Sequence, residues 1–134
     1  MIVQTLSPQS PAIIFAARHD YEGFAVRELQ IRTNSSLPPA VRMARIVCRD
    51  MKSEKAKAAA EEIAAALRAV ALPLRVIGAL EAPISRIAAH YRMAVEVFAA
   101  TATDLLRGLT TLRDQGLLKS DAHTAVDVDP LDLM

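Results

Sequence analysis

A short stretch in the second half of the chain combines positive charge with an aromatic ring. Arg86, His90 and Arg92 surround Tyr91 within the sequence SRIAAHYRM. Cationic side chains bind phosphate oxygens and an aromatic ring stacks on a nucleobase, so this composition is typical of a loop that contacts nucleic acid. We therefore predict DNA contacts at Arg86, His90, Tyr91 and Arg92. From charge alone, a solvated loop without a ligand is the simpler interpretation.

A second group of cations comes earlier, in and around a predicted strand. Arg42, Arg45 and Arg49 belong to this group. Arg42 and Arg45 can equally form ion pairs with carboxylates that fold near them. The predicted DNA contacts therefore do not include this group.

The other reactive side chains do not form the pattern of an enzyme or metal site. Asp127 and Asp129 could share one side of a strand, but no third metal ligand is evident. His19 and His123 are scattered and read as surface residues, while Cys48 alternates with apolar residues and reads as core. One cysteine excludes an internal disulfide and a zinc site built on paired cysteines. The P-loop pattern is absent. We predict no active site, no metal and no cofactor.

The elements that would position these residues follow the order β-α-β-β-α-β. Strands are predicted at 41–49, 74–80, around 93–97 and at 122–128, with a loop over 83–90, and the helices begin at caps Ser53 and Thr103. This order predicts an α+β, ferredoxin-like sandwich with two helices on one face of an antiparallel sheet. Right-handed crossovers place the first and third strands in the centre. The last strand then pairs with the first, and Val126 and Val128 face the core.

The first 39 residues are predicted to be an appendage. It contains a short strand at residues 2–6, a helix after Ser10-Pro11, and a second helix that starts at Asp20. The sequence TNSSLPP, residues 33–39, reads as a linker. We therefore divide the chain into an N-terminal appendage, 1–39, and a C-terminal α+β domain, 40–134.

Composition limits the class of protein. The 134 residues carry 16 Lys+Arg and 15 Asp+Glu, so the net charge is +1 and nucleic-acid binding must come from local clustering. No apolar run reaches the roughly 18 residues that span a bilayer, and no secretory signal is evident. We expect a cytoplasmic protein with no membrane partner. The 52% hydrophobic content suggests apolar surface for a partner, which includes a second copy in a homodimer.

Three stretches together resemble a known family. They are IVQTLSPQSPAI with the following HDYEGFAVRELQIR, then RVIGALEAPISRIAAHYRMAVEV, and the terminal AVDVDPLDLM. They are similar to the C-terminal part of primosomal protein N′, the PriA family of replication-restart DNA helicases, from about residue 2 to the end. The resemblance implies a ribosomal-protein-like domain that contacts forked or single-stranded DNA. It also implies contacts with the helicase core and with primosome proteins at stalled forks.

The chain departs from that family in several places. The ATP site and the zinc-binding cysteines of the parent family, an ATP-dependent 3′–5′ helicase, are absent from this sequence, so we expect no catalysis by the chain. Ala88 and Ala89 stand where the family favours glycine. Ala102 and Leu106 stand where some relatives place arginine and glutamine for the tail of the single-stranded-DNA-binding protein. This difference argues against binding of the tail of the single-stranded-DNA-binding protein by this chain.

Two other functions stay open beside a non-catalytic DNA-binding and interaction domain. The first is a free-standing protein–protein interaction module that dimerises through sheet edges. The second is a small-molecule-binding regulatory domain, because a ferredoxin-like shape supports many functions. Convergent polar groups in a pocket would be needed for the second, and the sequence does not reveal them.

Overall fold

The computed structural model describes residues 3–119 and 121–130. The chain divides into two compact units, Met1–Ala40 and Val41–Met134. The first unit contains helices α1 (Pro11–Ala17) and α2 (Tyr21–Asn34). The second contains four strands and two further helices, and it carries the candidate site.

The first unit is a pair of helices without a buried core of its own. Asp20 caps α2, because its Oδ1 accepts a hydrogen bond of 2.8 Å from the Gly23 N–H, as predicted. The rings of Phe15 and Phe24 lie 6.2 Å apart between centroids and connect the two helices. Neither helix contains a buried residue. The predicted strand at residues 2–6 is wrong for residues 3–6, which pair with no described strand, and residue 2 lies outside the described residues.

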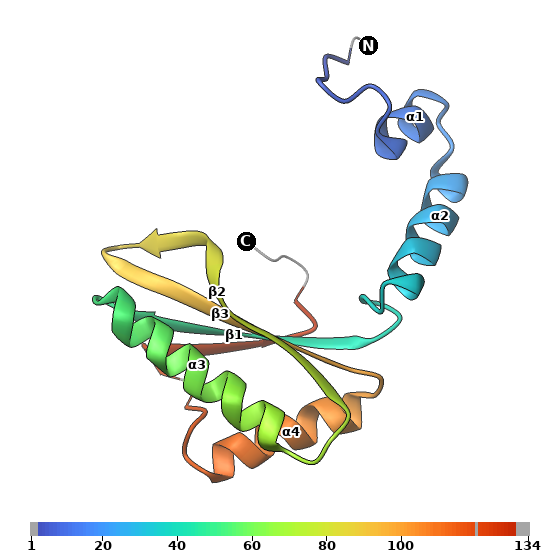
Figure 1. Ribbon diagram of the computed structural model, residues 1–134. Coiled ribbons are helices and arrows are strands. Elements are labelled where there is room, and N and C mark those ends of the chain that lie inside the picture. The colour runs from blue at the N-terminus through green and yellow to red at the C-terminus, as the bar shows by residue number, and fades with distance from the viewer. Residues whose placement is uncertain (1–2, 120, 131–134) are drawn as a thin grey trace. The chain divides into compact units, whose positions relative to one another are not determined.

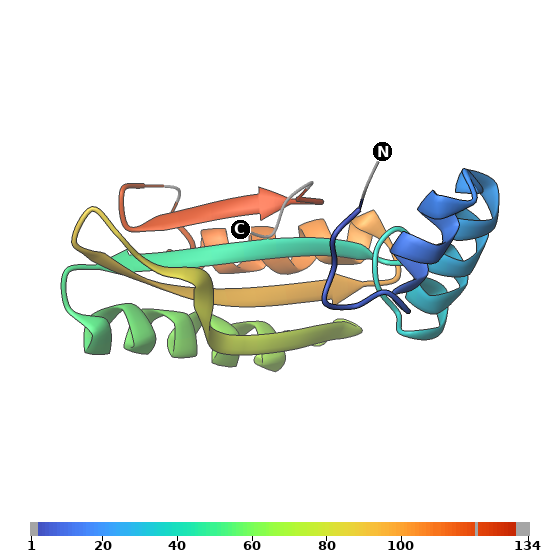
Figure 2. The same cartoon turned by 90° about the horizontal axis from the view of Figure 1, so that it is seen from above.

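The second unit is a four-stranded antiparallel sheet with two helices. Its elements are β1 (Arg42–Asp50), α3 (Ser53–Ala69), β2 (Leu74–Ile87), β3 (His90–Ala99), α4 (Ala102–Asp114) and β4 (Thr124–Val128). The strand order is β2-β3-β1-β4, so the prediction of β1 and β3 in the centre and β4 beside β1 is confirmed. Both helices lie on one face of the sheet (Figures 1 and 2).

The core lies between that face and the helices. Alternate residues of the strands meet the apolar faces of α3 and α4 because successive side chains of a strand point to opposite faces. The buried cluster includes Ala44, Ile46, Cys48, Val95 and Val97 from the sheet, Ala60, Ile63 and Leu67 from α3, and Leu105, Leu109 and Leu112 from α4. Cys48 is buried in this core, as predicted, and burial raises the pKa of its thiol to about 11.

Four details of the predicted elements are wrong. Thr101, and not Thr103, caps α4, because its Oγ1 accepts the N–H of Asp104 at 3.1 Å. Ser53 is the first residue of α3, and Lys52 precedes it as the cap. Val126 packs against the core, whereas Val128, at the end of an edge strand, is 40% exposed.

The fourth difference is the loop predicted over residues 83–90. Strand β2 continues for 14 residues to Ile87, and β3 begins at His90. Ala88 and Ala89 have φ angles of 48° and 65°, as in a two-residue type I′ hairpin turn. Pro83 fits into this long strand because the pairing with β3 is irregular between Glu81 and Arg86, where no ladder N–H is needed.

The sheet face that points away from α3 and α4, here called the open face, carries the charged residues of the centre strands. On β1 the alternation places Arg45 and Arg49 on this face. Arg45 lies opposite Glu96 of β3 and Asp127 of β4. Arg49 lies opposite Arg92. The row through Arg45 thus contains carboxylates, while the row through Arg49 places two arginines side by side.

Candidate nucleic-acid interface

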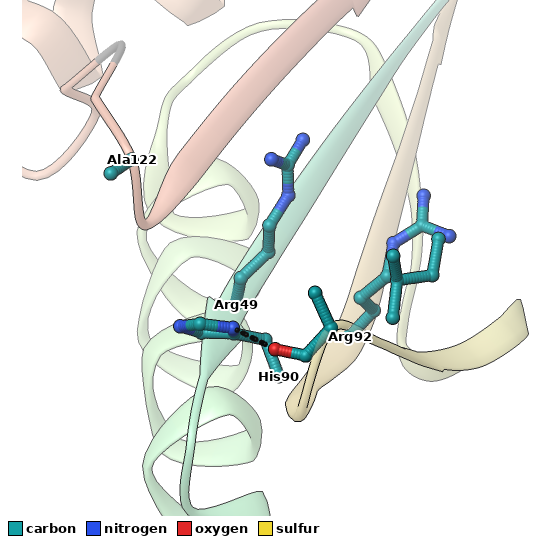
Figure 3. Close-up of a pocket in the computed structure, with 6 residues that line it drawn as sticks. Arg49, His90, Arg92 and Ala122 are labelled. Atoms are coloured by element: carbon teal, nitrogen blue, oxygen red, sulfur yellow. Dashed lines mark hydrogen bonds between the residues drawn. The ribbon is translucent and has the colours of Figure 1, made fainter.

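A pocket of about 360 Å³ lies where the β2–β3 hairpin meets the end of β1 and the residues just before β4. It is lined by Arg49, Ile87, Ala88, His90, Arg92 and Ala122 (Figure 3). Among these lining residues none is acidic, and three are basic or can become so. The pocket therefore combines an apolar wall with concentrated positive charge.

The positive charge comes mainly from two arginines on neighbouring strands. Arg49 and Arg92 are direct partners in the antiparallel register, and both side chains extend in the same direction from their strands (Figure 3). Like charges in directly opposite positions are unfavourable. Burial lowers the pKa of Arg92, and the charges of Arg49 and Arg45 lower it further. An anion in the pocket would relieve this repulsion.

Hydrogen bonds hold the backbone and part of the side chains in place. Arg92 Nη1 donates to the Ile84 carbonyl at 3.1 Å, which ties β3 to the irregular part of β2. The Arg49 N–H donates to the His123 carbonyl at 2.7 Å. The Nε of Arg49, however, is buried without a hydrogen-bond partner among the described residues. A buried donor without a partner is costly, so this N–H is available to donate a hydrogen bond to an anionic ligand.

His90 stands at the start of β3, beside the hairpin turn. Its Nδ1 lies 2.9 Å from the Ala88 carbonyl, which leaves the other ring nitrogen for a different partner (Figure 3). A neutral imidazole with Nδ1–H bonded to a carbonyl presents Nε2 as an acceptor, and a protonated one presents a second donor. His90 can therefore add a donor to the two arginines when it is protonated.

The remaining two predicted residues lie next to the pocket and not in it. Arg86 and Tyr91 are register partners across the hairpin, on the side opposite to His90 and Ile87. The Arg86 guanidinium carbon lies 5.0 Å from the centre of the Tyr91 ring, a cation–π contact. The four predicted site residues thus fall into two pairs, with His90 and Arg92 in the pocket and Arg86 and Tyr91 stacked on each other on the opposite side of the hairpin.

Sequence reasoning missed Arg49 as a member of this site. It belongs to the group of Arg42, Arg45 and Arg49, which the predicted DNA contacts leave out. Carboxylate pairing is predicted only for Arg42 and Arg45, and Arg42 does form an ion pair with Asp129. The spacing of four residues between Arg45 and Arg49 indicates a common face on a strand. It does not indicate which residue lies opposite, and the arginine opposite Arg49 is what makes the site.

The acidic residues near the C-terminus have structural partners. Asp129 pairs with Arg42 and accepts the Met43 N–H at 3.3 Å. Asp121 accepts the N–H groups of His123 and Thr124, and these bonds lower the pKa of its carboxyl group. Within residues 3–119 and 121–130, no three His, Cys, Asp or Glu side chains gather as a metal site would require. No helix of the same residues is long and apolar enough to cross a membrane.

Comparison with known proteins connects the whole chain to one family. A family model described as the primosomal protein N C-terminal domain matches residues 33–131. Replication restart protein PriA of Treponema pallidum is 30% identical over 135 residues, which cover 100% of this chain and 20% of that protein. The PriA proteins of Haemophilus influenzae and Bacillus subtilis are 28% and 33% identical, over 99% and 69% of this chain and 18% and 12% of their own lengths.

The chain therefore spans about a fifth of the length of these relatives or less. Because the family model covers most of the chain, the resemblance noted in the sequence is confirmed. This chain belongs to the primosomal protein N (PriA) C-terminal domain family.

Proposed function

We propose that this chain is a non-catalytic DNA-binding and interaction domain of a replication-restart helicase. The observation that carries the proposal is the pair Arg49 and Arg92, which face each other on the open face, with no acidic residue among the described residues that line their pocket. Family membership supports the replication-restart context. The same architecture of two helices on one face of a sheet of order β2-β3-β1-β4 supports classification as ferredoxin-like.

DNA would bind through its backbone. A phosphate in the pocket would accept hydrogen bonds from Arg49 and Arg92, and from His90 when that ring is protonated. Arg86 and Tyr91, stacked on each other on the opposite side of the hairpin, offer a further phosphate contact and an aromatic surface for a base. Contacts of this kind position a protein on DNA without reading its sequence, so binding should tolerate different DNA structures and weaken with salt.

Protein contacts form the second half of the proposal. Several large apolar side chains of α2 are exposed, among them Tyr21 at 78% and Val26 at 68%. Exposed apolar surface of this kind is typical of interfaces. We infer that residues 1–39 pack against the helicase core of a longer bacterial protein, in the cytoplasm, and that ATP-dependent unwinding belongs to that core. Primosome proteins at stalled forks are the further partners.

Fluorescence anisotropy with forked and single-stranded oligonucleotides tests the DNA half directly. With three or four phosphate contacts, the slope of log K against log salt should lie at about −2 to −4. Arg86→Ala combined with Arg92→Ala should abolish binding. Arg107→Ala combined with Arg113→Ala removes the same charge from α4, on the other face of the sheet, and should preserve it. Equal affinities for wild type and the first double variant would contradict the proposed site, and no binding by wild type would contradict the function.

A further inference from the structure

We propose that the Arg49–Arg92 pocket selects the terminal phosphate monoester at the end of a DNA strand over an internal phosphodiester. This inference rests on the proposed function, because it assumes that DNA is the ligand. It goes beyond that function by naming the part of the DNA that the pocket holds. The charge, the donors and the walls of the pocket carry it.

The charge of the pocket exceeds what one internal phosphate neutralises. Arg49 and Arg92 line it, and none of the described residues that line it is acidic. An internal phosphodiester carries one negative charge, whereas a phosphate monoester carries about 1.5 to 2 at neutral pH. The monoester also presents three acceptor oxygens to the donors. It therefore compensates the two facing guanidiniums more completely than a diester does.

The donors are arranged for one compact anion. The buried Nε of Arg49 has no partner among the described residues, and Nη1 of Arg92 is held by the Ile84 carbonyl, which fixes the direction of that guanidinium. Its remaining N–H groups are available to a ligand. A fixed, planar guanidinium beside a second one suits the closely spaced oxygens of a single phosphate.

The walls favour a chain end. Ile87 and Ala88 of the hairpin and Ala122, which precedes β4, are the apolar residues that line the pocket. An internal phosphate must enter with a sugar on both sides, while a terminal phosphate enters with the strand leaving in one direction only. The volume of about 360 Å³ is in the range of small-ligand pockets and accommodates a phosphate with its sugar.

The test compares oligonucleotides of one sequence that differ only at their ends. The full chain is titrated with DNA that bears a 5′-phosphate, a 3′-phosphate or hydroxyl groups, each labelled at a site away from the varied end. We expect phosphorylated DNA to bind about five- to tenfold more tightly at low salt. The 5′ and 3′ arms identify which end is preferred, and inorganic phosphate as competitor should reduce the preference.

Matched variants assign the preference to the pocket. Arg49→Gln should lower the ratio of the two affinities to about one, while Arg107→Gln, with the same loss of charge on α4, should keep it. Arg92→Gln serves as the second variant, and a thermal melt confirms that each variant is folded. If wild type binds all ends equally, or Arg49→Gln and Arg92→Gln keep the ratio, the inference is wrong although DNA binding stands. If wild type binds no DNA, the proposed function fails as well.

Discussion

The pair Arg49 and Arg92 favours the binding of an anion but destabilises the free domain. On the same face, Arg45 lies between the register positions of Glu96 and Asp127, an arrangement that compensates its charge. The Arg49–Arg92 pair has two like charges in opposite positions. Such a pair lowers the free energy of unfolding of the ligand-free domain. An anion bound in the pocket would offset this cost in the functional complex.

This interpretation predicts that removing one charge stabilises the free domain. Arg49→Gln should raise the free energy of unfolding by about 0.5 kcal/mol, because it removes the cross-strand repulsion and the buried Nε donor. For a domain of this size that corresponds to an increase of about 2–4 °C in Tm. Differential scanning fluorimetry at low salt measures it, with Arg107→Gln as the control that should not change. A decrease of similar size for Arg49→Gln would show that its charge is structural.

At the scale of the elements, the β2–β3 hairpin decides where the site residues lie. The pairing of Arg86 with Tyr91 and of Ile87 with His90 divides the four predicted residues between its two sides. The turn that closes it consists of Ala88 and Ala89, both with positive φ. An alanine in this left-handed region costs about 1–2 kcal/mol, so the turn is strained.

The strain makes the turn a place where stability can be gained. Ala88→Asn with Ala89→Gly supplies the residues that a type I′ turn prefers and should stabilise the domain by about 1–2 kcal/mol. Chemical denaturation measures this change in the free energy of unfolding. Ala58→Gly, at an exposed position inside α3, is the matched control and should destabilise by about 1 kcal/mol. An unchanged or lower stability of the turn variant would argue against the type I′ turn.

The element order could be predicted from the sequence because hydrophobic periodicity and chain handedness are local or general rules. They place β1 and β3 in the centre and β4 beside β1. The extent of β2 could not be predicted, since Pro83 indicates a loop. The strand continues beyond Pro83 because Arg86 and Ile87 pair with β3. The partner of Arg49 could not be predicted either, because register depends on contacts between distant segments.

At the scale of the whole molecule, the two units differ in how much apolar surface they bury. The unit Val41–Met134 has a closed core between its sheet and helices. The helices of Met1–Ala40 have no buried residue. In relatives that are about five times longer, the rest of the polypeptide is available to cover such surface.

The exposed helices should make the chain self-associate when it is studied by itself. Light scattering should show oligomers of the full chain at high protein concentration, while a version that begins at Val41 stays monomeric, because its core is complete. Tyr21→Ser combined with Val26→Ser in the full chain should reduce the association. Strictly monomeric behaviour of the full chain at the same concentration would mean that residues 1–40 need no partner.

The salt dependence of DNA binding tests the central claim, that facing arginines on the open face form a phosphate site. The measurement is an anisotropy titration of forked DNA at several salt concentrations. The proteins are wild type, Arg49→Gln with Arg92→Gln, and the charge-matched Arg107→Gln with Arg113→Gln. The pocket variant should bind at least about tenfold more weakly and lose about one unit of log–log slope, since the phosphate that both arginines hold is released. The α4 variant should match wild type in both quantities. Equal affinity and equal slope for the pocket variant and wild type would contradict the account.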